Sequence, residues 1–79
     1  MAKKITIYTT PTCVYCRMAK SFFNVRGVSF EEKNVLNDLA AKAEMINKSG
    51  ARVVPVIDVG GEILVGFHRE RLREIFGEA

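Results

Sequence analysis

Two cysteines three residues apart, Cys13 and Cys16, lie where a strand pattern gives way to a helix pattern, and this placement constrains the chain more than any other feature. Residues 4–8, just before them, are rich in β-branched and aromatic side chains and predict a strand. Pro11 ends that strand because it cannot donate a ladder hydrogen bond. Apolar residues then recur at helical spacing: Tyr15, Met18, Ala19, Phe22 and Phe23. The two thiols are therefore expected at the start of a helix that follows a strand.

The residues after this helix predict a second strand, parallel to the first. We expect Thr12 to cap the helix and Gly27 to end it. Residues 28–35 follow, where Val28 and Phe30 alternate with polar side chains, as in a half-buried strand. Two strands joined by a helix are expected to be parallel, with a right-handed crossover.

A second helix is expected in the middle of the chain. Apolar residues from Leu36 to Ile46 recur at helical spacing. Asn34 or Asn37 is the expected cap, and Gly50 suits the left-handed position at the end of the helix.

A hairpin and a third helix complete the chain. Residues 53–59 and 62–65 predict two strands, and the glycine pair between them is a hairpin signal. The buried face of the last helix is expected to consist of Leu72, Ile75 and Phe76. The order β-α-β-α-β-β-α predicts an α/β fold in which a mixed four-stranded sheet is flanked by three helices.

Length and composition predict one small globular domain, residues 1–79. A hydrophobic fraction of 48% with 27% charged residues argues against intrinsic disorder. No apolar run approaches the ~20 residues that span a bilayer, and the N-terminus lacks an export-type apolar stretch, so we expect a cytoplasmic protein without a membrane partner. The net charge of +3 comes from scattered residues, so no nucleic-acid partner is predicted.

Paired thiols at a helix start suit a reversible two-electron couple. Side chains at i and i+3 of a helix have Cβ atoms ~5–6 Å apart, and a disulfide needs ~3.5–4.5 Å, so a small adjustment closes the bond. Free amides and the positive end of the helix dipole stabilise a thiolate at the first turn. We therefore predict that Cys13 attacks a substrate disulfide and that Cys16 resolves the resulting mixed disulfide.

A zinc site is the main alternative for this cysteine pair. Structural zinc takes four ligands, and the chain offers only two cysteines and one histidine, His68. No metal site is predicted.

Three segments in the same order resemble the glutaredoxins. Residues 7–16 (IYTTPTCVYC) resemble the opening of that family, and residues 54–57 (VPVI) resemble its strand with a cis-proline beside the thiols. Gly66-Phe67 before a helix is similar to the glutaredoxin-like hydrogen-donor redoxins that serve ribonucleotide reductase. The resemblance covers nearly the whole chain. It implies a thioredoxin-like fold and thiol-disulfide oxidoreductase activity.

The resemblance also implies roles for individual residues. It assigns the nucleophile to Cys13, the resolving thiol to Cys16, a cis peptide to Pro55, and pairing with bound substrate to the backbone of Val54. The expected substrate-binding residues are Thr12, Tyr15, Arg52, Val54, Pro55, Gly66 and Phe67.

Several of these residues have a second interpretation. Tyr15 either contacts substrate or packs in the core, and Arg52 either grips a carboxylate or is a solvated loop cation. Pro55 could be an ordinary trans proline at a strand start. Phe67 is either an apolar docking spot or folds inward. Asp58 either faces outward or, if buried and protonated, relays a proton.

The resemblance implies no tightly bound cofactor, with glutathione as a co-substrate. The expected partners are disulfide-containing proteins such as ribonucleotide reductase, with glutathione or thioredoxin reductase as reductant, and a monomer is expected. The chain has Thr10, Val53 and residues 66–69 (GFHR) where glutathione-binding relatives often have Lys, Thr and a Gly-Gly pair with an acidic residue. The alternatives are a glutathione-dependent iron–sulfur cluster carrier between two subunits and a non-catalytic binding module.

Overall fold

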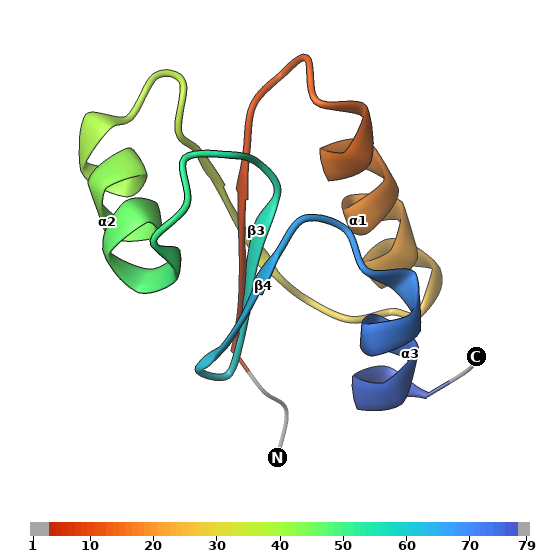
Figure 1. Cartoon of the computed structure of the whole chain (residues 1–79). Helices are drawn as coiled ribbons and strands as arrows, with labels where there is room; N and C mark the ends of the chain where they lie inside the picture. The colour runs from red at the N-terminus through yellow and green to blue at the C-terminus, as the bar shows by residue number, and fades with distance from the viewer. Residues whose placement is uncertain (1–3, 78–79) are drawn as a thin grey trace.

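The strand order in the sheet is β2-β1-β3-β4 in the computed structural model, which describes residues 4–77 (Figure 1). The central strand β1 (Ile5–Thr9) pairs in parallel with β2 (Glu31–Asn34) and antiparallel with β3 (Val56–Val59). β3 in turn pairs antiparallel with β4 (Glu62–Val65). The predicted mixed four-stranded sheet and the order β-α-β-α-β-β-α are therefore confirmed.

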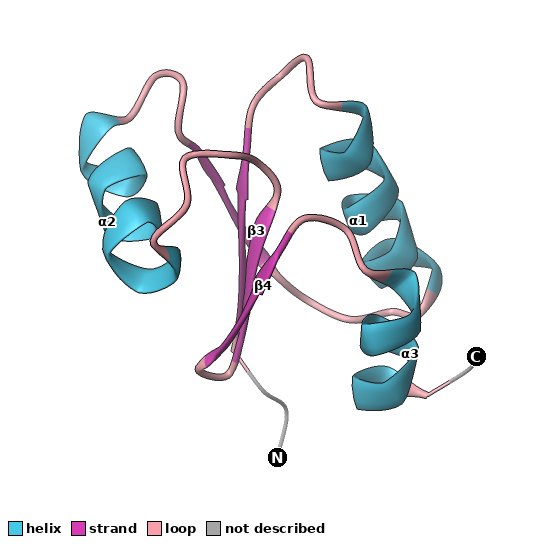
Figure 2. Ribbon diagram, in the orientation of Figure 1, coloured by secondary structure: helices cyan, strands magenta, loops and turns pink. Residues whose placement is uncertain are grey.

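Helices cover both faces of the sheet, as Figure 2 shows. α2 (Leu39–Ser49) lies on one face, and α1 (Val14–Val25) and α3 (Arg69–Phe76) lie together on the other. Strand side chains alternate between the faces, so Ile7 packs in the cluster under α1 and α3 while Tyr8 packs in the cluster under α2. Within residues 4–77 no helix has the length and apolarity to cross a membrane.

The edge strand β2 and the central strand β1 differ in how far their side chains are buried. All five residues of β1 are buried, because helices cover both its faces and strands flank both its edges. β2 is an edge strand and reads Glu-Glu-Lys-Asn, with its residues exposed or half-buried. Charged side chains on an edge strand discourage pairing with the strand of another chain.

Both ends of the second predicted strand are wrong. β2 covers 31–34 rather than 28–35, because Val28 and Phe30 pack against the core before the strand begins. Gly27, with φ of 66°, follows the last turn of α1 as expected.

The start of α2 was also predicted too early. The side chain of Asp38 accepts a hydrogen bond from the Ala41 amide and caps the helix, so neither Asn34 nor Asn37 does so. Asn34 instead accepts from the amide of Leu36, which lies before the helix and is 63% exposed. Gly50 ends α2 in the left-handed conformation, as predicted.

The hairpin is confirmed, with β4 at the predicted residues 62–65. β3 is shorter than predicted and begins at Val56, because Val53 and Val54 lie in the loop that leads to Pro55. On α3, Leu72 is fully buried, and Ile75 and Phe76 are half-buried against the same cluster.

Candidate active site at the start of the first helix

Cys13 itself is the N-cap of α1, which corrects the prediction that Thr12 would cap the helix. Its backbone is extended, and its Sγ accepts a hydrogen bond from the amide of Cys16 at 3.1 Å. The sulfur therefore takes the place of the oxygen that Ser, Thr or Asp supplies at an ordinary N-cap. It lies beside the free first-turn amides, at the positive end of the helix dipole.

Cys16 lies behind Cys13, in the protein interior. It is 1% exposed, whereas Cys13 is partly exposed, and both are free thiols. The pKa of Cys16 is raised to about 12, mainly by burial and to a smaller extent by its hydrogen bond with Cys13. The Thr10 backbone and the charge of Lys20 act in the opposite direction, but their effects are smaller. The pair thus consists of one accessible sulfur on a helix cap and one buried, protonated sulfur.

The loop before β3 brings a second segment to Cys13. The Val54–Pro55 peptide bond is cis, as the resemblance implies, and Pro55 is buried. The thiol of Cys13 donates a long hydrogen bond to the Val54 carbonyl oxygen, with 3.8 Å between the atoms.

Gly66 joins the third segment to this loop. Its amide donates to the Pro55 carbonyl at 2.7 Å, and its φ of 92° favours glycine. β1 ends, β3 begins and β4 ends at the same end of the sheet (Figure 1). The topology therefore places all three motifs at one end of the molecule.

The other expected site residues are arranged less closely around the thiols. Tyr15 is 61% exposed, so its interpretation as a packing residue is wrong. Thr12 is exposed in the turn before Cys13, and Arg52 is exposed in the loop before Val54. Phe67 folds inward to a half-buried position, with its ring 6.4 Å from that of Phe22.

Sequence reasoning did not find the polar cluster beside the buried thiol. The Glu32 carboxylate accepts from the hydroxyl of Thr9 at 2.7 Å and pairs with the Lys20 ammonium at 2.9 Å. Thr9 and Lys20 lower the pKa of Glu32 and keep it ionised. Lys20 follows Cys16 by four residues on the helix, and this spacing predicts a cation near the thiols; its pairing with Glu32 is what the sequence did not indicate.

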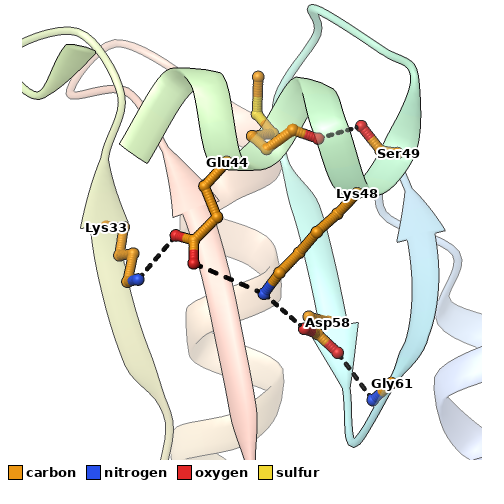
Figure 3. A network of polar contacts seen from close by, with 7 residues as sticks. Lys33, Glu44, Lys48, Ser49, Asp58 and Gly61 are labelled. Carbon is orange, nitrogen blue, oxygen red and sulfur yellow. Dashed lines mark hydrogen bonds and ion pairs between the residues drawn. The ribbon is translucent and has the colours of Figure 1, made fainter. Parts of the chain in front are cut away.

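A second polar network lies on the opposite face, under α2 (Figure 3). Glu44 pairs with Lys33 at 2.7 Å and with Lys48 at 3.8 Å, and Lys48 also pairs with Asp58 at 2.8 Å. Burial alone would raise the pKa of Asp58, but Lys48 and the Gly61 amide lower it below its ordinary value. Asp58 is therefore ionised, and the proton-relay interpretation is wrong.

No cluster of three or more His, Cys, Asp or Glu side chains that could hold a metal occurs within residues 4–77. The chemistry that the site offers is that of the two thiols. Of the expected binding residues, Val54 contacts Cys13 through its carbonyl oxygen and Gly66 is joined to the same loop at Pro55, while Tyr15 and Arg52 are exposed.

Known proteins resemble the chain in both sequence and structure. The sequence model of the Glutaredoxin family matches residues 5–64. Glutaredoxin 3 of Escherichia coli is 39% identical over 62 residues, covering 78% of this chain and 75% of that protein. The glutaredoxin-like protein NrdH of Escherichia coli is 33% identical over 72 residues, covering 91% and 88%.

A solved structure agrees with this relationship. The glutaredoxin of Archaeoglobus fulgidus superposes with a TM-score of 0.82 at 25% identity, over 91% of this chain and 84% of that one. The fold is therefore thioredoxin-like, as the resemblance implied. With the cysteine pair placed at the start of α1, this chain belongs to the glutaredoxin family and is a thiol-disulfide oxidoreductase.

Proposed function

We propose that this chain reduces disulfides in proteins by a two-thiol cycle in which Cys13 is the nucleophile and Cys16 the resolving thiol. The observation that carries the proposal is the difference between the two sulfurs. Cys13 Sγ is accessible and accepts the Cys16 amide, whereas the sulfur of Cys16 is buried and its pKa is raised to about 12. Only the first sulfur is placed to meet a substrate as a thiolate.

In the first step, the Cys13 thiolate attacks one sulfur of the substrate disulfide. A bond forms between Cys13 Sγ and that sulfur, the substrate S–S bond breaks, and the other substrate sulfur leaves as a thiolate. The helix N-terminus loses its negatively charged ligand in this step, because the sulfur of a mixed disulfide is neutral.

In the second step, Cys16 gives up its proton and attacks Cys13 Sγ. The mixed disulfide breaks, the second substrate sulfur leaves as a thiolate, and an internal Cys13–Cys16 disulfide forms. The substrate gains two electrons and the protein loses two. Cys16 reacts from its place one turn into the helix, so the attack requires only a local adjustment.

The residues around Cys13 suggest how a substrate is held. We propose that the backbone of Val54 pairs with an extended substrate segment, a mode that accepts many sequences. Tyr15 would cover that segment, Arg52 would reach a carboxylate, and Gly66 leaves room for close approach. Thr12 and Pro55 would border the same segment, and Phe67 would support it from below.

Two reductants fit this cycle, glutathione and thioredoxin reductase. We propose disulfide proteins such as ribonucleotide reductase as oxidised partners, glutathione as at most a co-substrate rather than a bound cofactor, and a monomer as the active form. The cytoplasm is the proposed location, because thiols are kept reduced there.

The test measures reduction of 2-hydroxyethyl disulfide with each donor system: glutathione with its reductase, and thioredoxin reductase with NADPH. The wild-type chain should turn over with at least one system, and Cys13→Ser should lose activity with both. Cys16→Ser should accumulate the mixed disulfide with substrate, seen by mass spectrometry. Turnover with neither donor, or an active Cys13→Ser variant, would refute the proposed cycle.

A further inference from the structure

A groove of about 300 Å³ lies between α1 and α3, on the face of the sheet opposite α2. Apolar side chains from α1 and from the turn before α3 line it, among them Met18, Phe22 and Phe67. Arginines border it as well, including Arg26 just after α1 and Arg69 at the start of α3. We call this feature the α1–α3 groove.

Two of the groove's guanidinium groups, those of Arg26 and Arg69, lie against aromatic rings. Arg26 lies over the ring of Phe22 at 3.6 Å from its centroid, and Arg69 lies 5.8 Å from the centroid of Phe67. Neither arginine forms an ion pair within residues 4–77. Arg71, on another side of α3, is by contrast paired with both Glu62 and Glu74.

Basic residues outnumber acidic ones on α1 and α3. α1 contains no acidic residue and two basic ones, Arg17 and Lys20, of which Lys20 pairs with Glu32. On α3, Arg69 and Arg73 are four residues apart and share one side of the helix.

The α1–α3 groove lies along the same helix that Cys13 caps, and its first lining residue on α1, Met18, follows Cys13 by five positions. Cys13 caps α1, whose flank forms one wall, and Phe67 follows Gly66, whose amide is bonded to Pro55. α1 is ~18 Å long at 1.5 Å per residue, a length that roughly five or six extended residues span. A chain segment joined to a disulfide at Cys13 can therefore lie along the groove.

We propose that the α1–α3 groove binds an acidic segment with one apolar anchor residue, located within about six residues of the disulfide that Cys13 reduces. Carboxylates would pair with Arg26 and Arg69, and the anchor would pack on Met18 and Phe22. This inference rests on the proposed function, because it names the class of protein substrate for the same thiols.

The test uses four synthetic peptides, each a mixed disulfide with the same small thiol at one cysteine. Three carry a leucine with acidic, neutral or basic residues at positions three to six from the cysteine, and the fourth is the acidic peptide with glycine in place of leucine. The readout is the ratio of kcat/KM for the acidic to the basic peptide. Misfolding or damaged thiol chemistry lowers both rates and leaves this ratio unchanged.

We expect the wild-type ratio to be about tenfold at low ionic strength and to fall toward about twofold at high salt. Arg69→Glu and Arg26→Glu together should bring the ratio below one. Arg69→Glu alone should lower the ratio. This substitution should not destabilise α3, because an acidic residue is favourable in the first turn of a helix. The matched control is Lys42→Glu on α2, which makes the same charge change on the opposite face and should leave the ratio near the wild-type value.

Equal rates for acidic and basic peptides in the wild type, or an equal effect of Lys42→Glu, would overturn the groove proposal. The groove proposal would also be overturned if the peptide without leucine had the same KM and duplex DNA competed as strongly as the acidic peptide. These results would indicate a surface that binds polyanions in general. Reduction of none of the four peptides would instead count against the proposed function itself, so the two failures are distinguishable.

Discussion

The charged side chains on the two faces of the sheet have different partners. Under α2, a chain of ion pairs runs from Lys33 through Glu44 and Lys48 to Asp58 and ties β2, α2 and β3 together (Figure 3). On the face covered by α1 and α3, Arg26 and Arg69 of the groove lie over aromatic rings. The charged side chains under α2 pair with one another across three elements, whereas Arg26 and Arg69 form no ion pair within residues 4–77.

The apolar clusters beneath the two faces differ as well. The cluster under α1 and α3 contains the aromatic contacts among phenylalanines, whereas the cluster under α2 is built around Tyr8, Met45 and Val56. α1 positions both thiols, so it needs a rigid base. Interlocking rings provide one because they bury large area and have preferred packing geometries.

The largest predicted effect is the loss of Phe23 from the cluster under α1. This ring is fully buried, and its centroid lies 5.4 to 5.8 Å from those of three other phenylalanines. Phe23→Ala should cost about 4 kcal/mol of unfolding free energy, against about 3 kcal/mol for Met45→Ala under α2. Urea unfolding followed by circular dichroism measures both.

A milder pair of variants keeps this comparison testable if the alanine variants do not fold. Phe23→Leu and Met45→Leu should retain the fold, and only the first should slow the reaction of Cys13 with iodoacetamide or with substrate, because it loosens the base of α1. Equal effects of the two leucine variants on thiol reactivity would break the distinction between the faces.

The sequence could predict those parts of the molecule whose local signals agree with their tertiary surroundings. The four strands, the three helices and the place of the thiols followed from periodicity, Pro11 and the glycines. The chain near residues 28–38 could not be read correctly, because Val28 and Phe30 are buried by packing before β2 rather than within it. Leu36, which fits a helical period, lies exposed outside α2.

The surroundings of the site were harder to predict than the site itself. The spacing of the two cysteines is enough to predict the thiol site. The pairing of Lys20 with Glu32, however, joins α1 to β2 and depends on the parallel register of β1 and β2. Arg26 and Arg69 lie 43 positions apart and share a groove only because α1 and α3 pack on one face. Such contacts between distant segments leave no local pattern.

The second prediction concerns the ion pairs under α2 and their pH dependence. The pKa of Asp58 is lowered in the folded protein, so its contribution to stability is present above its unfolded pKa of ~3.9 and is lost as pH falls through the folded value. Lys48→Met removes the counter-charge and should cost about 1 kcal/mol at pH 7. Acid unfolding should then begin at higher pH, because burial raises the pKa of an unpaired Asp58.

The control for this variant is Lys42→Met on the same helix, since Lys42 forms no ion pair within residues 4–77. Unfolding at pH 7, pH 4 and pH 2.5 should show the cost of Lys48→Met shrinking as pH falls, and no such trend for Lys42→Met. A cost that is the same at all three pH values would show that Lys48 acts through its methylene packing and not through Asp58.

The last prediction compares the caps of the two longer helices, α1 and α2. Asp38 caps α2 with a carboxylate that accepts the Ala41 amide at 3.0 Å, and Cys13 caps α1 with sulfur that accepts the Cys16 amide at 3.1 Å. Asp38→Ala and Cys13→Ala should each cost about 1 kcal/mol, because a first-turn amide loses its acceptor. The serine variants should separate the two caps: Asp38→Ser should change stability little, and Cys13→Ser should equal or exceed the wild type.

The Cys13→Ser result would show what the cap of α1 is selected for. A serine hydroxyl is among the best N-cap acceptors, so a more stable but inactive Cys13→Ser variant would mean that the reactive face gives up helix stability for a sulfur nucleophile. If Cys13→Ser were instead as unstable as Cys13→Ala, the sulfur would have to stabilise the fold by some contact other than the cap. That result would contradict the idea that the α1 face gives up helix stability for reactivity while the α2 face does not.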